Sequence, residues 1–274
     1  MFRMKKLFTF MMLATALAFA ACSEDPYQRG EQSGGLEEES EELLPAKDGR
    51  VVIAYVTWYG KGIPDPTLMT NINYAFAELY VRDGVYEGFK LQGSEDRFRQ
   101  VVALKKKNPK LKISLSFSHT VDNSDNYQGG GFSALAKSDE YRKAFAKDCR
   151  DFCSKWGIDG IDIDWEFPGL SWSGHACDPA VDVENHVLLM KQLRETLGTR
   201  YLLTYAGYVM DVTSSSGGRR FIDIKEVDPY VDFVNIMTYD MDAAPNHQSA
   251  LKDEDAYYDC ERAVKTYVNA GVSP

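Results

Sequence analysis

Three carboxylates recur at every second position of one short segment of the chain. Asp162, Asp164 and Glu166 alternate with apolar residues, which are Ile161, Ile163 and Trp165. Successive side chains of a β-strand point to opposite faces, so the three acids would share one face and the apolar residues would pack behind them. Carboxylates this close together cannot all ionise without cost, and we expect at least one raised pKa. A protonated Glu166 at the end of such a strand suits general acid catalysis.

A calcium loop, a metal site and a solvated edge strand fit this acidic segment less well. A calcium loop would need the EF-hand spacing and its glycine, which the segment lacks. A metal site of three carboxylates is not joined by a histidine close in sequence, because His175 stands in the following loop. A solvated edge strand would expose the intervening isoleucines and tryptophan, which are residue types that need burial.

The acidic segment is one of six β-rich runs that alternate with helical windows. The runs are 51–57, 71–79, 112–118, 158–166, 201–207 and 232–239. They are mostly apolar, which suits strands buried on both faces. The spacing of apolar residues predicts helices over 94–107, 138–156, 183–197 and 255–270. This alternation predicts a parallel sheet, either open and doubly wound or closed as a (β/α) barrel.

Two segments carry a resemblance to a known family. The octapeptide Asp159-Gly160-Ile161-Asp162-Ile163-Asp164-Trp165-Glu166 resembles the Asp-x-x-Asp-x-Asp-x-Glu signature of family 18 glycoside hydrolases, the chitinase family. Met237-Thr238-Tyr239-Asp240 is similar to the end of that family's sixth barrel strand. The resemblance runs from about Val51 to the last residue. It implies an α/β fold, a (β/α)8 TIM barrel in which the six runs are strands one to six.

The resemblance also implies a chemistry. The substrate would be a β-1,4-linked N-acetylglucosamine polymer whose own acetamido oxygen attacks the anomeric carbon, with retention of configuration. Glu166 would act first as the acid and then as the base. Asp164 would orient the acetamide and share a proton with Asp162, while Tyr239 would hold the acetamide from the opposite wall. The residues implied to bind substrate are Tyr55, Phe76, Ser116, Met237, Asp240 and Asp159. No metal ion and no organic cofactor is implied.

Several features leave alternatives open. Trp58, Trp172 and Tyr208 are candidates for stacking on sugar rings, although plain packing explains them equally well. The third strand ends Ser116-Phe117-Ser118-His119, without the two glycines usual in the family, which predicts either a narrower site or an altered loop. Two other functions remain: an endo-β-N-acetylglucosaminidase acting on N-glycans, and a glycan-binding protein without catalysis.

The number of strands predicts a partial barrel. Six strand–helix units precede Pro274, whereas a closed barrel needs eight. We expect residues 50–274 to form part of a family 18 catalytic domain without strands seven and eight. Strands one and six would then be unpaired edges, and we expect weak stability and impaired hydrolysis.

The N-terminal region predicts export and anchoring. A basic start precedes an apolar run from Leu7 to Ala21, which predicts a secretory signal over residues 1–21. Phe19-Ala20-Ala21-Cys22 resembles a bacterial lipoprotein cleavage site and implies lipidation of Cys22; simple cleavage near Ala21 is the alternative. The acidic residues 22–49 predict a disordered tether. We expect secretion across the inner membrane and an outer-membrane or cell-surface lipoprotein, attached to the membrane by its lipid.

Composition narrows the class of partner. The chain has 274 residues, 44% of them hydrophobic and 26% charged, which excludes a disordered or multi-pass membrane protein. With 41 acidic and 31 basic residues the net charge is −10, which argues against nucleic acid as the partner. Five cysteines are too few for a disulfide scaffold; Cys149 and Cys153 are expected in helix packing. We expect a monomer that binds a neutral N-acetylglucosamine-containing glycan.

Overall fold

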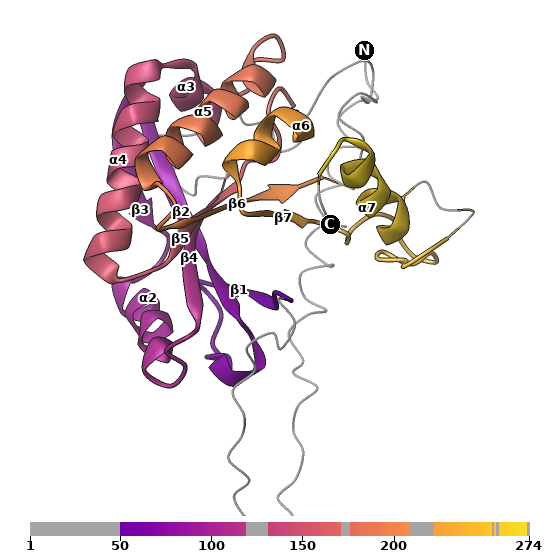
Figure 1. Ribbon diagram of the computed structural model, residues 1–274, viewed down its shortest axis with the longest axis horizontal. Helices are drawn as coiled ribbons and strands as arrows, with labels where there is room; N and C mark the ends of the chain where they lie inside the picture. Colours follow the sequence, from indigo (N-terminus) through magenta and orange to yellow (C-terminus); the bar gives the residue numbers. More distant parts are fainter. Residues whose placement is uncertain are drawn as a thin grey trace, which may run out of the picture. The chain divides into compact units, whose positions relative to one another are not determined.

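The computed structural model describes residues 50–118, 131–170, 176–208, 222–253, 255 and 258–272. Their centre is a sheet of six parallel strands to which a further, antiparallel strand is attached (Figure 1). The strands are β1 (Ile53–Thr57), β2 (Asn71–Arg82), β3 (Val85–Leu91), β4 (Lys112–Ser118), β5 (Gly160–Asp164), β6 (Leu202–Gly207) and β7 (Phe233–Ile236).

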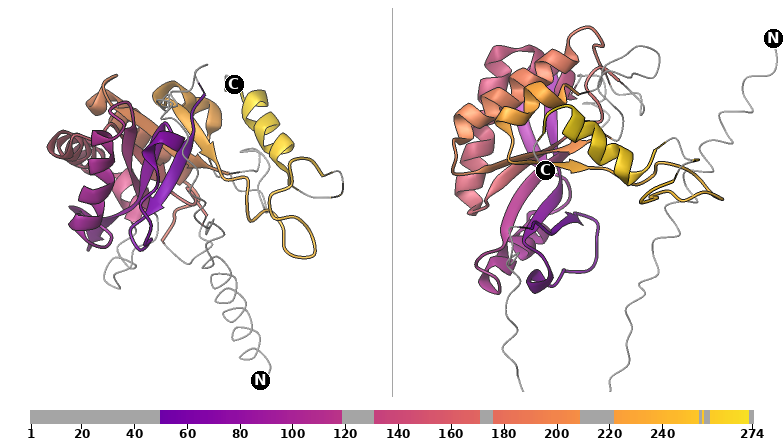
Figure 2. Two further views of the ribbon diagram at one scale, coloured as in Figure 1. Left: turned by 90° about the horizontal axis from the view of Figure 1, so that it is seen from below. Right: turned by 45° about the vertical axis from the view of Figure 1, so that its right-hand side comes forward.

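The order of the strands decides between the two predicted sheet types. The parallel strands lie side by side in the order β1-β2-β4-β5-β6-β7, which is their order along the chain. A doubly wound sheet reverses its direction of growth part-way, and this sheet does not. It curls as part of a (β/α) barrel (Figure 2), with β1 and β7 as its edges in the described residues. The predicted fold class is confirmed.

Helices follow most of the parallel strands, and most of them gather on one side of the sheet, while the last helix, coloured yellow, lies apart from the others beyond β7 (Figure 1). They are α2 (Glu95–Val102), α3 (Gly131–Lys137), α4 (Asp139–Trp156), α5 (Asp182–Leu197), α6 (Ile224–Val227) and α7 (Cys260–Asn269), with 3-10 turns η1 (Pro66–Leu68), η2 (Ala103–Lys106) and η3 (Asp228–Tyr230). The two ends of α4 are set by capping residues that can be recognised in the sequence. The Ser138 hydroxyl accepts a hydrogen bond from Tyr141 N, and Gly157 ends the helix at φ 65°.

The core lies between the sheet and these helices. Phe117 of β4 and Phe145 of α4 are fully buried with ring centroids 5.0 Å apart, and Phe89 of β3 packs 4.8 Å from Phe117. Burying one such side chain contributes about 1.5–3 kcal/mol. The cysteines Cys149 and Cys153 are buried beside them, as the sequence predicts.

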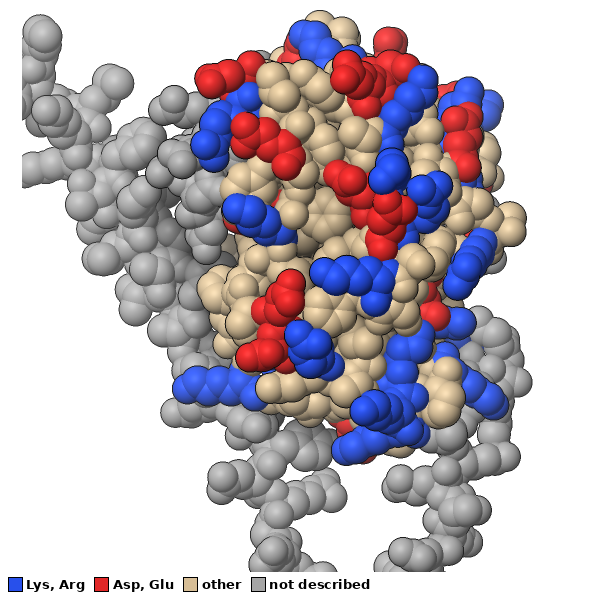
Figure 3. All heavy atoms as spheres, turned by 90° about the vertical axis from the view of Figure 1, so that its left-hand side faces the viewer, with Lys and Arg blue, Asp and Glu red and all other residues tan. Residues whose placement is uncertain are grey.

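The outer surface of α4 is polar. Lys143 pairs with Asp139 and Lys147 with Asp151, each at 2.7 Å and four residues apart. On the face of the molecule that includes α4, both signs of charge are interspersed (Figure 3). Exposed pairs of this kind contribute about 0.3–0.5 kcal/mol each, so they serve solubility more than stability.

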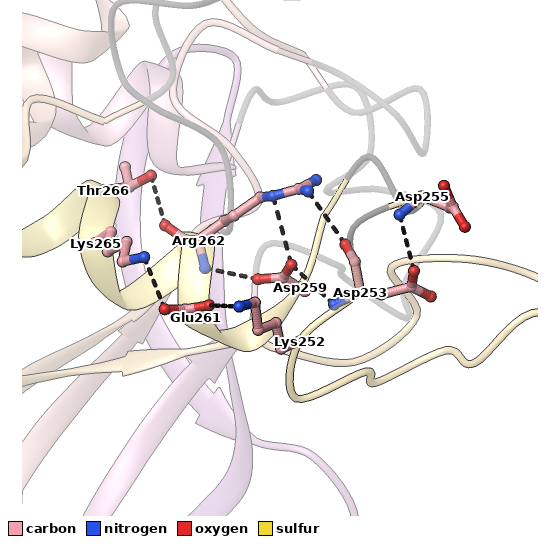
Figure 4. A network of polar contacts seen from close by, with 8 residues as sticks. All are labelled: Lys252, Asp253, Asp255, Asp259, Glu261, Arg262, Lys265 and Thr266. Atoms are coloured by element: carbon pink, nitrogen blue, oxygen red, sulfur yellow. Dashed lines mark hydrogen bonds and ion pairs between the residues drawn. The ribbon is translucent and has the colours of Figure 1, made fainter.

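Helix α7 is fixed at its start by a polar network (Figure 4). The buried carboxylate of Asp259 accepts hydrogen bonds from Arg262 N at 2.7 Å and Asp253 N at 3.2 Å. The side chain of Arg262 donates a hydrogen bond from Nη2 to the carbonyl oxygen of Asp253 at 3.1 Å. Further along α7, Tyr267 Oη donates to the carbonyl oxygen of Tyr208 at 3.0 Å, which ties the helix to the end of β6.

Three elements differ from the sequence prediction. Strand β3 was not expected, although Asp83-Gly84 between β2 and β3 is a typical hairpin turn, and both residues have positive φ, 51° and 76°. The short helices α3 and α6 were also missed, because they are too short to show a helical period. Helix α7 begins at Cys260 rather than near Asp255. Among the described residues, no helix has the length and apolar character needed to cross a membrane.

Candidate active site

Strand β5 presents its two types of side chain to opposite sides. Asp162 and Asp164 are buried on the side that faces away from the helices, and Glu166 follows directly after the strand. Trp165 is 2% exposed and stacks on Phe132 of α3, with centroids 5.4 Å apart. The apolar residues of the segment therefore hold the strand against the helices while its acids converge at the carboxyl ends of the parallel strands.

Asp162 is a fully buried carboxylate with four hydrogen-bond donors. Its Oδ1 accepts from Thr204 Oγ1 at 2.6 Å and Asn235 Nδ2 at 3.1 Å. Its Oδ2 accepts from Ser116 Oγ at 2.7 Å and Tyr55 Oη at 2.9 Å. Burial raises the pKa of Asp162, and these four hydrogen bonds act in the opposite direction because they stabilise the ionised form. The donors come from β1, β4, β6 and β7, so Asp162 joins four strands of the sheet.

The environment of Asp164 differs from that of Asp162, because it supplies a second carboxyl instead of four hydrogen-bond donors. Burial raises the pKa of its carboxyl well above the usual range, and the nearby Glu166 and Asp162 add to the increase. In the described part of the chain, its buried Oδ1 accepts no hydrogen bond. The hydrogen bond that Asp164 makes with Glu166 favours the neutral form of Asp164. Burial also raises the pKa of Glu166, and the hydrogen bond from Asp164 opposes that shift.

These two carboxyls are hydrogen-bonded to each other, which requires a proton on one of them because an ionised carboxylate can only accept. The sequence predicts a raised pKa within the cluster, and burial raises the pKa of both Asp164 and Glu166. The structure also gives Asp164 a hydrogen bond to Glu166, whereas the four hydrogen bonds of Asp162 come from other strands. A proton held between two carboxyls at an accessible strand end is available for transfer.

Two tyrosines lie close to this pair. Tyr239 follows β7 and is 56% exposed; partial burial and the neighbouring acidic groups Asp164 and Glu166 raise its pKa to about 12. Tyr208 follows β6, packs against Phe167 at 4.7 Å, and has its pKa raised by burial and by Glu166. Both hydroxyls stay protonated at neutral pH and can donate hydrogen bonds.

A second buried carboxylate supports the loop after Glu166. Asp182 at the start of α5 accepts from Ser133 Oγ at 2.7 Å, Asp178 N at 2.6 Å and Gly169 N at 3.3 Å. The loop is closed on itself by hydrogen bonds between Phe167 and Leu170 in both directions. The backbone beside Glu166 is thus fixed from both α3 and α5.

The sequence model of the family described as Glycosyl hydrolases family 18 matches residues 51–274. The chain belongs to this family. Probable chitinase 2 of Drosophila melanogaster is 30% identical over 212 residues, which cover 70% of this chain and 40% of the fly protein. The family 18 chain thus spans less than half the length of that relative.

Two solved structures resemble the family 18 chain over most of its length. The chitinase domain of the spore coat protein CotE from Clostridium difficile superposes with a TM-score of 0.69 at 27% identity, covering 88% of this chain and 66% of that one. A family 18 N-acetylglucosaminidase from Paenibacillus barengoltzii gives a TM-score of 0.62 at 28% identity, covering 81% and 65%.

The remaining residues that the sequence analysis named differ in burial and in position within the family 18 fold. Ser116 is completely buried on Asp162. Phe76 lies at an irregularity of β2, where the pairing with β4 shifts between Ala75 and Ala77. Met237 is partly buried against the core, and the exposed Asp240 has a φ of 52°.

Asp159, expected among the substrate-binding residues, is at the opposite end of β5. Its carboxylate forms ion pairs with Lys105 and, at 3.5 Å, with Lys112, and accepts from Ile113 N at 2.9 Å. Asp164 is five residues further along the chain, a distance of about 16 Å in an extended strand. Asp159 therefore secures the amino end of the strand and does not reach the acids.

Some functional residues were missed, and some predicted ones lie outside the described residues. Thr204 and Asn235 were not singled out, although each is a polar residue within an otherwise apolar predicted strand, which is a usable indication. Cys22, His119 and Trp172 lie outside the described residues, as do the predicted signal and tether, and these stay predictions. No group of three or more metal-ligating side chains occurs among the residues the structure describes.

Proposed function

We propose that the family 18 chain hydrolyses β-1,4 linkages between N-acetylglucosamine units, with retention and with the substrate's acetamide as the nucleophile. The observation that carries the proposal is the hydrogen-bonded pair of carboxyls, the buried Asp164 and the partly buried Glu166, at the carboxyl ends of the strands. The chitinases among its relatives support the choice of substrate.

The shared proton can be moved by the substrate itself. Without substrate, the neutral form of Asp164 donates to Glu166. An acetamide N–H that reaches Asp164 stabilises its ionised form, which leaves the proton on Glu166. Glu166 then protonates the glycosidic oxygen as the bond to the anomeric carbon breaks.

The surrounding groups favour the same sequence of events. Asp162, held in place by four donors, keeps negative charge beside Asp164 and so helps to keep the proton within the pair. The hydroxyl of Tyr239 is protonated and can donate to the acetamide, which holds the nucleophilic oxygen near the anomeric carbon. Glu166, now ionised, accepts a proton from the water that opens the intermediate.

The decisive experiment compares the chain with its Glu166→Gln variant on N-acetylated chitooligosaccharides. Removing the proton donor while keeping the shape should lower turnover about 10²–10⁴-fold and leave binding intact. An Asp159→Asn variant, altered at the far end of the same strand, should keep wild-type turnover.

The same assay distinguishes the alternatives. Cleavage of an N-glycan core but not of chitooligosaccharides would indicate an endo-β-N-acetylglucosaminidase. Binding of chitooligosaccharides with no hydrolysis by either protein would indicate a glycan-binding role. Equal turnover in wild type and Glu166→Gln would contradict the assignment of Glu166.

A further inference from the structure

The β2–β3 hairpin extends one edge of the site. Strand β2 pairs with β4 from Asn71 to Ala77, and from Ala77 to Arg82 it pairs with β3. Because β2 runs parallel to β5, its outer half projects at the same end of the sheet as Asp164 and Glu166. The hairpin therefore lies at the end of the sheet that carries the acids, not at the opposite end, where the parallel strands begin.

One face of the hairpin packs on the helices. Leu79 and Val81 are buried in the core, and Phe89 packs against Phe117 and Phe145. On this side Tyr86 Oη donates to the carboxylate of Asp148 on α4 at 3.0 Å.

The other face is polar. We call Glu78, Tyr80, Lys90 and Gln92 the hairpin polar face. Tyr80 Oη and Gln92 Nε2, the latter at 3.4 Å, donate to the carboxylate of Glu78, which is 6% exposed. The ammonium of Lys90 lies 4.6 Å from the centroid of the Tyr80 ring. The buried carboxylate thus orients a tyrosine and an amide, while the exposed Lys90 covers the ring.

Strand register puts this face on the same side of the sheet as the acids. Ser118 is the partner of Asp164, and Phe117 is the partner of Ala77, so Glu78 comes level with Ser118. Phe117 and Ala77 point to the helices, so Glu78 points to the side of Asp164. Two strand spacings separate Glu78 from Asp164, about 10 Å.

We infer that the hairpin polar face binds a sugar unit beyond the one that reacts. It offers donors from Lys90 and Gln92 to the hydroxyl and acetamide oxygens of an uncharged amino sugar, and a ring for its apolar edge. The carboxylate of Glu78 stands opposite Lys90 in the β2–β3 pair and fixes the Tyr80 hydroxyl and the Gln92 amide before the ligand arrives. This inference rests on the proposed function and adds a preference for longer chains.

Two tyrosines of the hairpin provide a matched test. Tyr80→Phe and Tyr86→Phe each remove one hydroxyl that donates to a carboxylate, on opposite faces. In a Glu166→Gln background, calorimetric titration measures Kd for N-acetylated chitohexaose and chitotriose. Tyr80→Phe, and separately Lys90→Met with Gln92→Leu, should raise Kd for the hexamer about fivefold or more. Kd for the trimer should change less than about twofold, and Tyr86→Phe should leave the ratio of the two values unchanged.

The outcomes separate the two proposals. If the Glu166→Gln parent binds both sugars and none of the polar-face variants changes the ratio of Kd values, the hairpin inference is overturned alone. If Tyr86→Phe changes the ratio as much as Tyr80→Phe, the effect comes from hairpin stability and the inference is also overturned. If the parent binds neither sugar, the proposed function fails together with the inference.

Discussion

The two ends of strand β5 carry the same residue type in opposite environments. At the amino end, Asp159 is surrounded by two lysines and a backbone N–H. At the carboxyl end, Asp164 has a second carboxyl, Glu166, as its hydrogen-bond partner and a buried oxygen without a donor in the described residues. One aspartate is compensated by charge, and the other is compensated only by holding a proton.

This difference separates structural from chemical use of an acid. A compensated carboxylate stabilises the fold through its ion pairs and hydrogen bonds. An uncompensated one costs stability and keeps a proton that can be transferred, and proteins retain such groups mainly where they act. Asp162 lies between the two cases, since its four partners are uncharged side chains that supply it fully with hydrogen bonds.

The largest effect on stability is expected at Asp162. Asp162→Ala would leave the buried hydroxyls of Ser116 and Thr204 and the partly buried amide of Asn235 without this acceptor, and we expect a loss of about 3 kcal/mol or more in the free energy of unfolding. Asp162→Asn retains one acceptor oxygen and should lose less. Denaturant titration measures both. An alanine variant as stable as wild type would show that these hydrogen bonds do not hold the strands.

An intermediate effect is expected in the pH dependence of stability. Asp164 binds its proton more tightly in the folded chain, so its stabilisation is complete below pH 3.8, the ordinary pKa, and is lost as the pH rises through the raised value. Each unit of increase corresponds to about 1.4 kcal/mol. Asp164→Asn cannot ionise, so its stability should fall less than that of wild type between about pH 4 and pH 8. Parallel pH profiles of the melting temperature for the two proteins would contradict the raised pKa.

The smallest effect is expected at Asp159. Asp159→Asn removes the charge that pairs with Lys105 and Lys112 but keeps an acceptor for Ile113 N, and we expect a loss of about 1 kcal/mol or less that shrinks at high salt. Thermal unfolding at low and high salt measures it. A change in turnover without a change in stability would place Asp159 at the site after all and would break the comparison between the two ends.

The fold was predictable where local patterns decide it. Alternating β-rich and helical runs indicated six parallel strands, and Ser138 and Gly157 marked the ends of α4 correctly. The hairpin strand β3 was missed because its residues, such as Glu87 and Gly88, do not form an apolar run; the Asp83-Gly84 turn was the signal that could have indicated it. Placing Asp159 at the site failed because a signature motif contains residues that serve different ends of one strand.

By itself, the sequence determined that Asp162, Asp164 and Glu166 lie on one side of β5, because the two-residue period of a strand is a local property. Only the tertiary structure decided which of them receives hydrogen-bond donors and which has another carboxyl as its partner. The donors to Asp162 stand 42 to 107 residues away in sequence, and strand register alone brings them to it while leaving Asp164 with a carboxyl as its neighbour. A pKa depends on these distant partners and on burial, which no spacing within a single segment can specify.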